Sequence, residues 1–339
     1  MILPILKRYN AFWDHEVWER PVLFLFEHVN ALGMSNPQDL EEKWFGTDAE
    51  MTEIKWQEAN IRYHADGFAN YWPNIGPGAV AGMLGSPYRL AETTVWYGKH
   101  PSVESVRDIA TLSLREGDGI CRAVTDRTIK AAEYGAGRYI TGMTDMGENL
   151  DLLAMLRGTE NLLMDLIDCP EDVVTALNAV DEIWEQAFTG MYLILNRYYP
   201  RGDMSTWMPI WLQGRWYPLE CDFSIMISPE DYARFVVPSI TRHARFLDRS
   251  IYHLDGVGAT KHLPALLNIR ELDGIQWTPG AGIANTASDQ WFPMYEQIQA
   301  AGKNLVLLDN LTPKEVLYLL KNLSHKGLYI HTPVASAEE

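Results

Sequence analysis

Residues 252–256, Tyr-His-Leu-Asp-Gly, give the strongest chemical signal in the chain. An apolar run ends at His253, an acid follows two residues later at Asp255, and a glycine then lets the chain turn. Side chains two residues apart in an extended chain point to the same side, so this imidazole and carboxylate would face one site. Such a pair suits metal ligation, or a base with its orienting acid. The structural alternative is that His253 bonds a carbonyl and Asp255 caps the next helix.

Two further acidic segments could take part in chemistry. Glu220 and Asp222 flank Cys221 ahead of an expected helix, where they could bind a soft divalent metal or raise each other's pKa. The alternative there is a solvated acidic loop with a buried cysteine. Glu27 directly follows the apolar run 21–26, and an acid at the end of an apolar strand is costly unless it is solvated or used. Glu27, Asp222 and Asp255 are therefore the candidate catalytic acids.

Aromatic and glycine-rich segments could form the walls of a binding pocket. The chain has 12 Trp and 16 Tyr, and several fall in expected loops, where they could hold a flat or apolar ligand. Glycines 280 and 282 follow another apolar run and would allow a ligand close to the backbone. A packed loop or an ordinary turn accounts for the same residues. The candidate substrate-binding residues are Tyr71, Trp72, Asn74, Trp96, Gln276 and Trp277.

Composition excludes several classes of function. The formal net charge of −17 repels phosphate backbones and anionic lipids, so we expect neither a nucleic-acid nor a membrane partner. Three widely spaced cysteines without a CxxC exclude a disulfide framework and a Cys-rich structural zinc site. No GxSxG or HExxH motif occurs. Because no apolar run of membrane length and no secretory signal is visible, we expect a cytoplasmic protein.

Short apolar runs alternate with helical patterns along the 339 residues. Continuous apolar strands between helices are typical of a parallel sheet covered on both faces. About eight such units favour a closed (β/α)₈ TIM barrel, with functional residues in the loops that follow the strands. The expected strands are 21–26, 139–142, 205–212, 250–253, 274–277 and 304–308, with shorter ones near 68–71, 93–97 and 327–330.

The helices have clear start signals, and no linker or repeat divides the chain. Ser228-Pro and Thr312-Pro, each followed by an acid, predict helix starts, and residues 170–198 carry a helical apolar stripe. We predict a single domain, 1–339, in which 1–64 form an N-terminal helical cap including the first strand and 65–339 the remainder of the barrel. Residues 335–339 look like the opening of a last helix. His100, His243, His262 and His325 are expected at the surface or in caps.

Three segments resemble the uroporphyrinogen-decarboxylase-like superfamily. The first combines His253-Leu-Asp-Gly with residues 262–267 and 272–277, like the superfamily strand that ends in His-x-Cys-Gly or His-x-Asp-Gly before a helix. The second, 74–85, is similar to the loop and helix after its second strand, and the third, 221–235, to the segment before the helix that follows its fifth. Together they span most of the chain, and the resemblance implies the barrel fold.

Within that superfamily the chain looks more like the corrinoid-linked methyltransferases than the true porphyrinogen decarboxylases. The Arg-rich N-terminal motif of the decarboxylases has no match around residues 13–21, and a charge of −17 suits an octa-anionic porphyrinogen poorly. The methyltransferases hold zinc with His-x-Cys and a later Cys. His253 matches the His, Asp255 stands where the first Cys would be, and residues 332–334 contain no Cys. Metal ligands drawn from His253, Cys221, Glu220 and Asp255 would still leave one position open for substrate.

The resemblance therefore implies a methyltransferase that demethylates a small O- or N-methyl compound and passes the methyl group to a corrinoid protein. Zinc on His253 and Cys221, completed by Asp255 or Glu220, would polarise the methyl-bearing heteroatom. One alternative is a metal-free decarboxylase or lyase, with Asp222 or Asp255 as a general acid of raised pKa. A second is a non-catalytic relative that binds a ligand and has lost the full ligand set.

Overall fold

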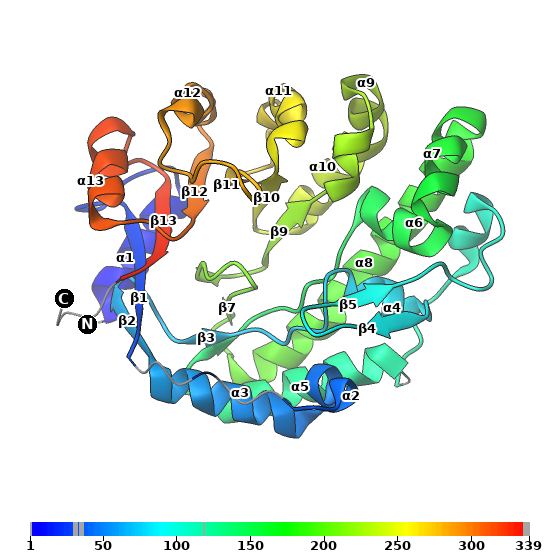
Figure 1. Ribbon diagram of the computed structural model, residues 1–339, viewed down its shortest axis with the longest axis horizontal. Coiled ribbons are helices and arrows are strands. Elements are labelled where there is room, and N and C mark those ends of the chain that lie inside the picture. The colour runs from blue at the N-terminus through cyan, green and yellow to red at the C-terminus, as the bar shows by residue number, and fades with distance from the viewer. Residues whose placement is uncertain (1, 30–32, 34–36, 118, 335–339) are drawn as a thin grey trace.

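The computed structural model describes residues 2–29, 33, 37–117 and 119–334 (Figure 1). The helix expected at 335–339 lies outside these residues. The fold is mixed α/β, with a seven-stranded central sheet in the order β2-β1-β13-β12-β11-β10-β9. Its strands are β1 (Val22–His28), β2 (Ile61–Ala65), β9 (Trp216–Glu220), β10 (Arg249–Asp255), β11 (Gly274–Thr278), β12 (Asn304–Leu308) and β13 (Leu328–Pro333).

All strand pairs of the central sheet are parallel except β1 with β2. From β9 onward, strands alternate with helices, which lie along the outer side of the curved sheet (Figure 1). These helices are α9 (Pro229–Asp231), α10 (Val237–Phe246), α11 (Leu263–Leu267), α12 (Phe292–Ala300) and α13 (Pro313–Asn322). Because parallel strands end at one edge of a sheet, the loops after β9 to β13 converge there.

The remaining strands are short and lie outside the central sheet. Strand β3 (Asn70–Tyr71) pairs in parallel with β6 (Ile140–Thr141). Strands β4 (Tyr88–Leu90) and β5 (Val95–Tyr97) form an antiparallel hairpin. The strand expected near 93–97 is therefore present as β5, but it does not belong to the central sheet.

The single strand expected at 205–212 was wrong. The chain instead forms two short antiparallel strands, β7 (Asp203–Met204) and β8 (Leu212–Gln213), joined by a loop. Within this loop Thr206 Oγ1 accepts the Met208 N–H at 3.1 Å, and Pro209 has no N–H to offer a ladder. Strand β9 was missed, because Pro218 within it argues against a strand; β9 pairs only with β10 among the described strands, and an end strand tolerates proline.

The predicted helix starts are confirmed. Ser228 Oγ accepts the Asp231 N–H at 3.1 Å. Thr312 and Glu315 form a reciprocal capping box at the start of α13. Helix α8 (Pro170–Tyr198) has the length and the buried stripe expected for 170–198. In the described ranges, no helix combines the length and the apolar character needed to cross a membrane.

The other helices belong to the first half of the chain. They are α1 (Ile2–Trp13), α2 (Leu40–Phe45), α3 (Thr47–Asn60), α4 (Ala79–Leu84), α5 (Gly119–Gly135), α6 (Asn149–Arg157) and α7 (Thr159–Asp168). The N-terminal segment to residue 64 thus contains helices and the first strand, as expected, and most of β2 as well. That first strand pairs with the last one, β13, so both ends of the described chain meet in one sheet.

A buried ion pair ties three of these helices together. Arg127 on α5 donates from Nε to Glu50 Oε1 on α3 at 3.1 Å, and both side chains are almost fully buried. The guanidinium also donates to the Trp44 carbonyl of α2 at 2.8 Å and to the Tyr71 hydroxyl of β3 at 3.2 Å. The Arg127 guanidinium thus links its own helix, α5, to three other elements, α2, α3 and β3.

Candidate functional site

Three potential metal ligands meet at the carboxyl ends of β9 and β10. Asp222 begins the 3₁₀ helix η2 (Asp222–Met226) directly after β9, and His253 and Asp255 belong to β10. The ligand atoms of these three residues all lie within 4.8 Å of one another. The two strands are neighbours, with His253 opposite Glu220 in the register. The structure therefore brings His253 and Asp255 together, as their spacing suggested, and adds Asp222.

The orientation of the His253 ring is fixed by Gln276 on the neighbouring strand β11. Gln276 donates its Nε2 hydrogens to the Trp277 carbonyl and to Thr278 Oγ1, both at 2.9 Å, so its Oε1 is the atom that faces His253. His253 Nδ1 bonds this Oε1 and must carry the hydrogen. Nε2 is then the basic nitrogen, which is the arrangement seen when a second residue orients a metal-binding histidine.

Cys221 and Glu220 are not members of this group. Cys221 is 3% exposed and packs in the hydrophobic core, where burial raises the pKa of its thiol. Its backbone is extended, so it points away from the side taken by its neighbours. The structure therefore brings Asp222 together with His253 and Asp255, and does not bring Cys221 and Glu220 into this cluster. Glu220 lines the adjacent cavity instead.

A second acidic segment, which the sequence did not single out, packs beneath the site. Asp145 and Glu148 follow the short strand β6, and Asp151 lies in the first turn of α6. Asp145 Oδ1 accepts the N–H groups of Gly78 and Gly147, and Asp151 accepts those of Asp222 and Phe223 at 2.8 Å. Asp151 therefore fixes the start of η2, which carries Asp222 of the candidate metal site. An Asp-x-x-Glu-x-x-Asp run just after an apolar strand was the signal that could have revealed these residues.

The carboxyl groups around the candidate metal site have pKa values above their usual range. Burial raises the pKa of Asp145 to about 6, and burial with the nearby Asp222 charge raises that of Asp151 to about 7. Burial and Asp145 raise the pKa of Glu220 well above its usual range. Burial also raises the pKa of Asp222, while the His253 charge opposes that rise. Two groups that exchange protons near neutral pH, Asp145 and Asp151, therefore lie close to the candidate metal site.

We expect Asp145→Asn to flatten the pH dependence of stability. The folded pKa of Asp145 is raised, so its contribution is complete below about pH 4 and is lost as the pH rises through about 6. An asparagine Oδ1 can keep both backbone hydrogen bonds. In thermal unfolding experiments in EDTA, the stability of the variant relative to the wild type should rise between pH 4 and 8. A difference that stays constant over this pH range would contradict the assignment.

A buried histidine supports the same acidic segment. His243, fully buried on α10, contacts Glu148 Oε2 through Nδ1 at 2.8 Å and Asp181 Oδ1 through Nε2 at 3.4 Å. Glu148 Oε1 in turn accepts the Glu220 N–H at the end of β9. The surface or capping position expected for His243 was wrong, and His100 and His262 are buried as well.

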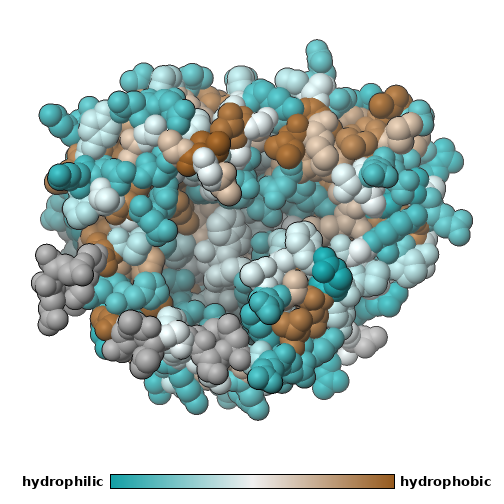
Figure 2. Space-filling view, in the orientation of Figure 1, coloured by the Kyte–Doolittle hydropathy of each residue, from teal (hydrophilic) through white to brown (hydrophobic). Residues whose placement is uncertain are grey.

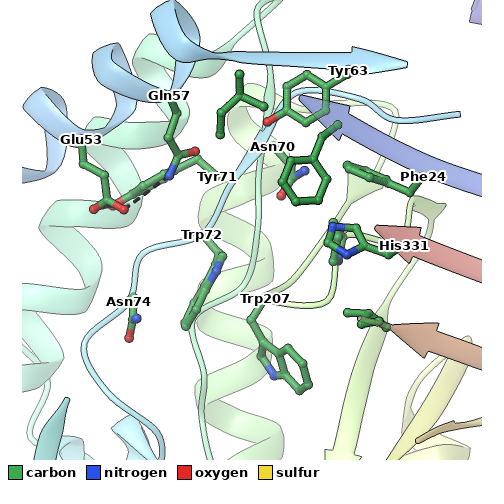
Figure 3. Close-up of a pocket in the computed structure, with 14 residues that line it drawn as sticks. Phe24, Glu53, Gln57, Tyr63, Asn70, Tyr71, Trp72, Asn74, Trp207 and His331 are labelled. Carbon is green, nitrogen blue, oxygen red and sulfur yellow. Dashed lines mark hydrogen bonds between the residues drawn. The ribbon is translucent and has the colours of Figure 1, made fainter. Parts of the chain in front are cut away.

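Three cavities adjoin the candidate metal site, and the molecule is visibly hollowed at its centre (Figure 2). A cavity of about 410 Å³ is lined by Asp222, Glu220 and Trp96, among others. One of about 350 Å³ is lined by Asp255 and the loop after β11. The third, of about 270 Å³, is lined mostly by aromatic and amide side chains, including Tyr71, Trp72 and Asn74 (Figure 3).

The sequence-based binding residues therefore divide into two sets. Four of them line a cavity: Trp96, Tyr71, Trp72 and Asn74. Gln276 is 1% exposed and orients His253, and Trp277 is fully buried against Trp291. The sequence led us to expect both in a cavity wall, but neither lines one of the three cavities. Successive side chains of β11 point to opposite faces of the sheet, and both faces of this strand are covered, so Gln276 and Trp277 are both buried.

Glu27 lies apart from this group. Its Oε2 pairs with His64 Nε2 at 3.0 Å, between β1 and β2. Trp207 was not predicted, since it lies in the loop mistaken for a strand. Its ring meets the His253 ring edge-on at 5.2 Å and lines the aromatic cavity.

No family model matches the chain, and no curated protein matches its sequence.

Proposed function

We propose that this chain is a metal-assisted methyltransferase that demethylates a small methyl compound and passes the methyl group to a corrinoid protein. The observation that carries this proposal is the Asp222–His253–Asp255 group beside an aromatic cavity. One imidazole and two carboxylates are donors that zinc accepts, and three protein ligands leave a position open for substrate. The resemblance of residues 253–256 to the superfamily motif supports the same reaction class.

We further propose that the fold is a (β/α)₈ barrel of that superfamily, formed by one domain. Eight strands support it: the parallel β1, β9, β10, β11, β12 and β13, with the parallel pair β3 and β6 between β1 and β9 in the chain. The Met146 N–H donates to the Tyr217 hydroxyl of β9 at 2.7 Å, which links the β6 end to the sheet. Active sites of such barrels lie at the carboxyl ends of the strands.

In this proposal the residues of the chain bind the substrate and donate or accept protons. The aromatic cavity holds the methyl compound, and Gln276 keeps the basic nitrogen of His253 available. Zinc, when bound, would supply a Lewis acid for the electron pair that the heteroatom keeps when its bond to the methyl group breaks. The same electron pair takes up a proton as the demethylated product is released, and Asp145 and Asp151, with pKa values near neutrality, are the proton reservoir. We propose a cytosolic location, where a corrinoid partner would be met.

The test uses the full chain, stripped with EDTA and then either left metal-free or given zinc. Reduced cobalamin is supplied as methyl acceptor with a panel of small N- and O-methyl compounds. We expect methylcobalamin and the demethylated product to appear in equal amounts, only with zinc and a suitable donor. No product from any donor after zinc is restored, or equal rates without zinc, would contradict the proposal.

The second candidate function is a metal-free decarboxylase or lyase. The raised pKa values of Asp145 and Asp151 favour it, because such groups can donate protons at neutral pH without a metal. It predicts turnover of a carboxylated substrate in EDTA, with a pH profile that shifts in Asp145→Asn.

A further inference from the structure

The aromatic cavity has a consistent chemical character. Its volume of about 270 Å³ suits a compact molecule, below the ~300 Å³ at which drug-sized sites begin. Figure 3 shows Trp72 on one side, with Trp207, His331 and Phe24 on the other. These rings come from four separate parts of the chain: β1, the segment after β3, the loop after β7 and β13. A ligand between them would meet aromatic surfaces from two sides.

The polar side of this cavity is acidic. Glu53 on α3 lines it, and its carboxylate accepts from Gln57 Nε2 at 3.3 Å and from the Tyr71 hydroxyl at 3.5 Å (Figure 3). Among the described residues that line the cavity, none is a lysine or an arginine. Arg127 bonds the Tyr71 hydroxyl without lining the cavity, and pairs with Glu50.

His331 adds no positive charge to the cavity at neutral pH. Burial lowers the pKa of His331 to about 4, so its ring is neutral and acts as another flat surface. It stacks on Phe26, with ring centroids 4.9 Å apart. A pocket of electron-rich rings with one carboxylate and no cation attracts positive ligands.

We propose that this cavity binds a small methylated ammonium ion, held between the faces of Trp72 and Trp207 with Glu53 as its counter-ion. Aromatic faces attract such ions through the ring quadrupole, and the attraction is strongest where water is excluded. Trp207 also contacts His253, so the cavity adjoins the candidate metal site. The inference rests on the proposed function, for which it names the substrate class: an N-methyl ammonium compound, not a neutral O-methyl compound.

The test compares two ligands of nearly the same shape on the wild-type chain in EDTA. Choline carries a trimethylammonium group, and 3,3-dimethylbutan-1-ol replaces its nitrogen with carbon and carries no charge. Ligand-observed NMR titration should give choline an affinity at least about tenfold higher, as expected for a desolvated cation–π site. Equal affinities, or no binding of choline, would overturn the inference.

Variants locate the bound ion. Trp72→Leu and Glu53→Gln should each weaken choline binding, the former by about tenfold. Tyr318→Leu is the control: Tyr318 on α13 is 41% exposed and lines none of the three cavities, so choline binding should not change. An equal loss in Tyr318→Leu would place the ion elsewhere and overturn the inference. Because these titrations need neither zinc nor turnover, they can succeed or fail independently of the methyl-transfer assay.

Discussion

Replacing His253 by alanine is expected to abolish divalent-metal binding and to lower methyl transfer at least about 100-fold. His253 supplies the single nitrogen in a group whose other donors, Asp222 and Asp255, are carboxylates. Changing residues that merely orient a metal ligand costs about 10–100-fold in metal affinity or activity, so removing a ligand should cost more. Elemental analysis of protein purified without an affinity tag, followed by zinc titration, measures the first effect.

Two companion variants make this test specific. Gln276→Ala removes the group that orients the His253 ring, so zinc affinity should fall by about 10–100-fold while the ligands remain. Cys221→Ala is the control, because Cys221 is packed in the core and is not one of the three clustered ligands. Zinc retained in His253→Ala, or lost in Cys221→Ala, would contradict the Asp222–His253–Asp255 site.

Replacing Arg127 by leucine should lower the free energy of unfolding by about 3–5 kcal/mol, the usual cost of removing one partner from a buried ion pair. Glu50 would keep its buried position without the guanidinium, and the Trp44 carbonyl and the Tyr71 hydroxyl would lose their donor. Urea denaturation followed by tryptophan fluorescence and by far-ultraviolet circular dichroism measures the change.

The same helix provides the control for this variant. Arg122 on α5 pairs with Asp126 at 3.4 Å on the surface, so Arg122→Leu should cost below about 1 kcal/mol. The loss in Arg127→Leu should also grow as the pH rises. Burial raises the Glu50 pKa to about 7 even with Arg127 present, so the unpaired carboxyl is tolerated when protonated and costly when charged. Equal losses in the two variants, or no pH effect, would contradict this account.

Local periodicity found those parts of the site that lie on regular strands. The two-residue spacing of His253 and Asp255 placed them on one side of β10, and the structure brings their ligand atoms together. The same rule, applied to Glu220, Cys221 and Asp222, would have turned Cys221 away from both acids. The sequence-based ligand set differs from the cluster in the structure because it included Cys221 for its thiol, whereas the extended backbone turns Cys221 away from Asp222.

The remaining site residues depend on long-range arrangement. Gln276 meets His253 only through the register of β10 with β11, which no local pattern reveals. Asp145 and Asp151 follow the strand expected at 139–142, but only the packing of this segment against β9 and η2 brings them to the site. Trp207 was missed as a site residue because it lies in a segment whose composition is typical of a strand, although Pro209 interrupts that segment. Tertiary contacts, and not intrinsic preferences, decide these positions.

The pairing of β1 with β13 also sets an order of events during synthesis. Residues 22–26 leave the ribosome well before their partners in the sheet, residues 329–333. Until then β1 has only β2 beside it, and the aromatic cavity lacks His331. In this interval β1 is an apolar strand with one unpaired edge, and exposed strands of that kind tend to associate wrongly.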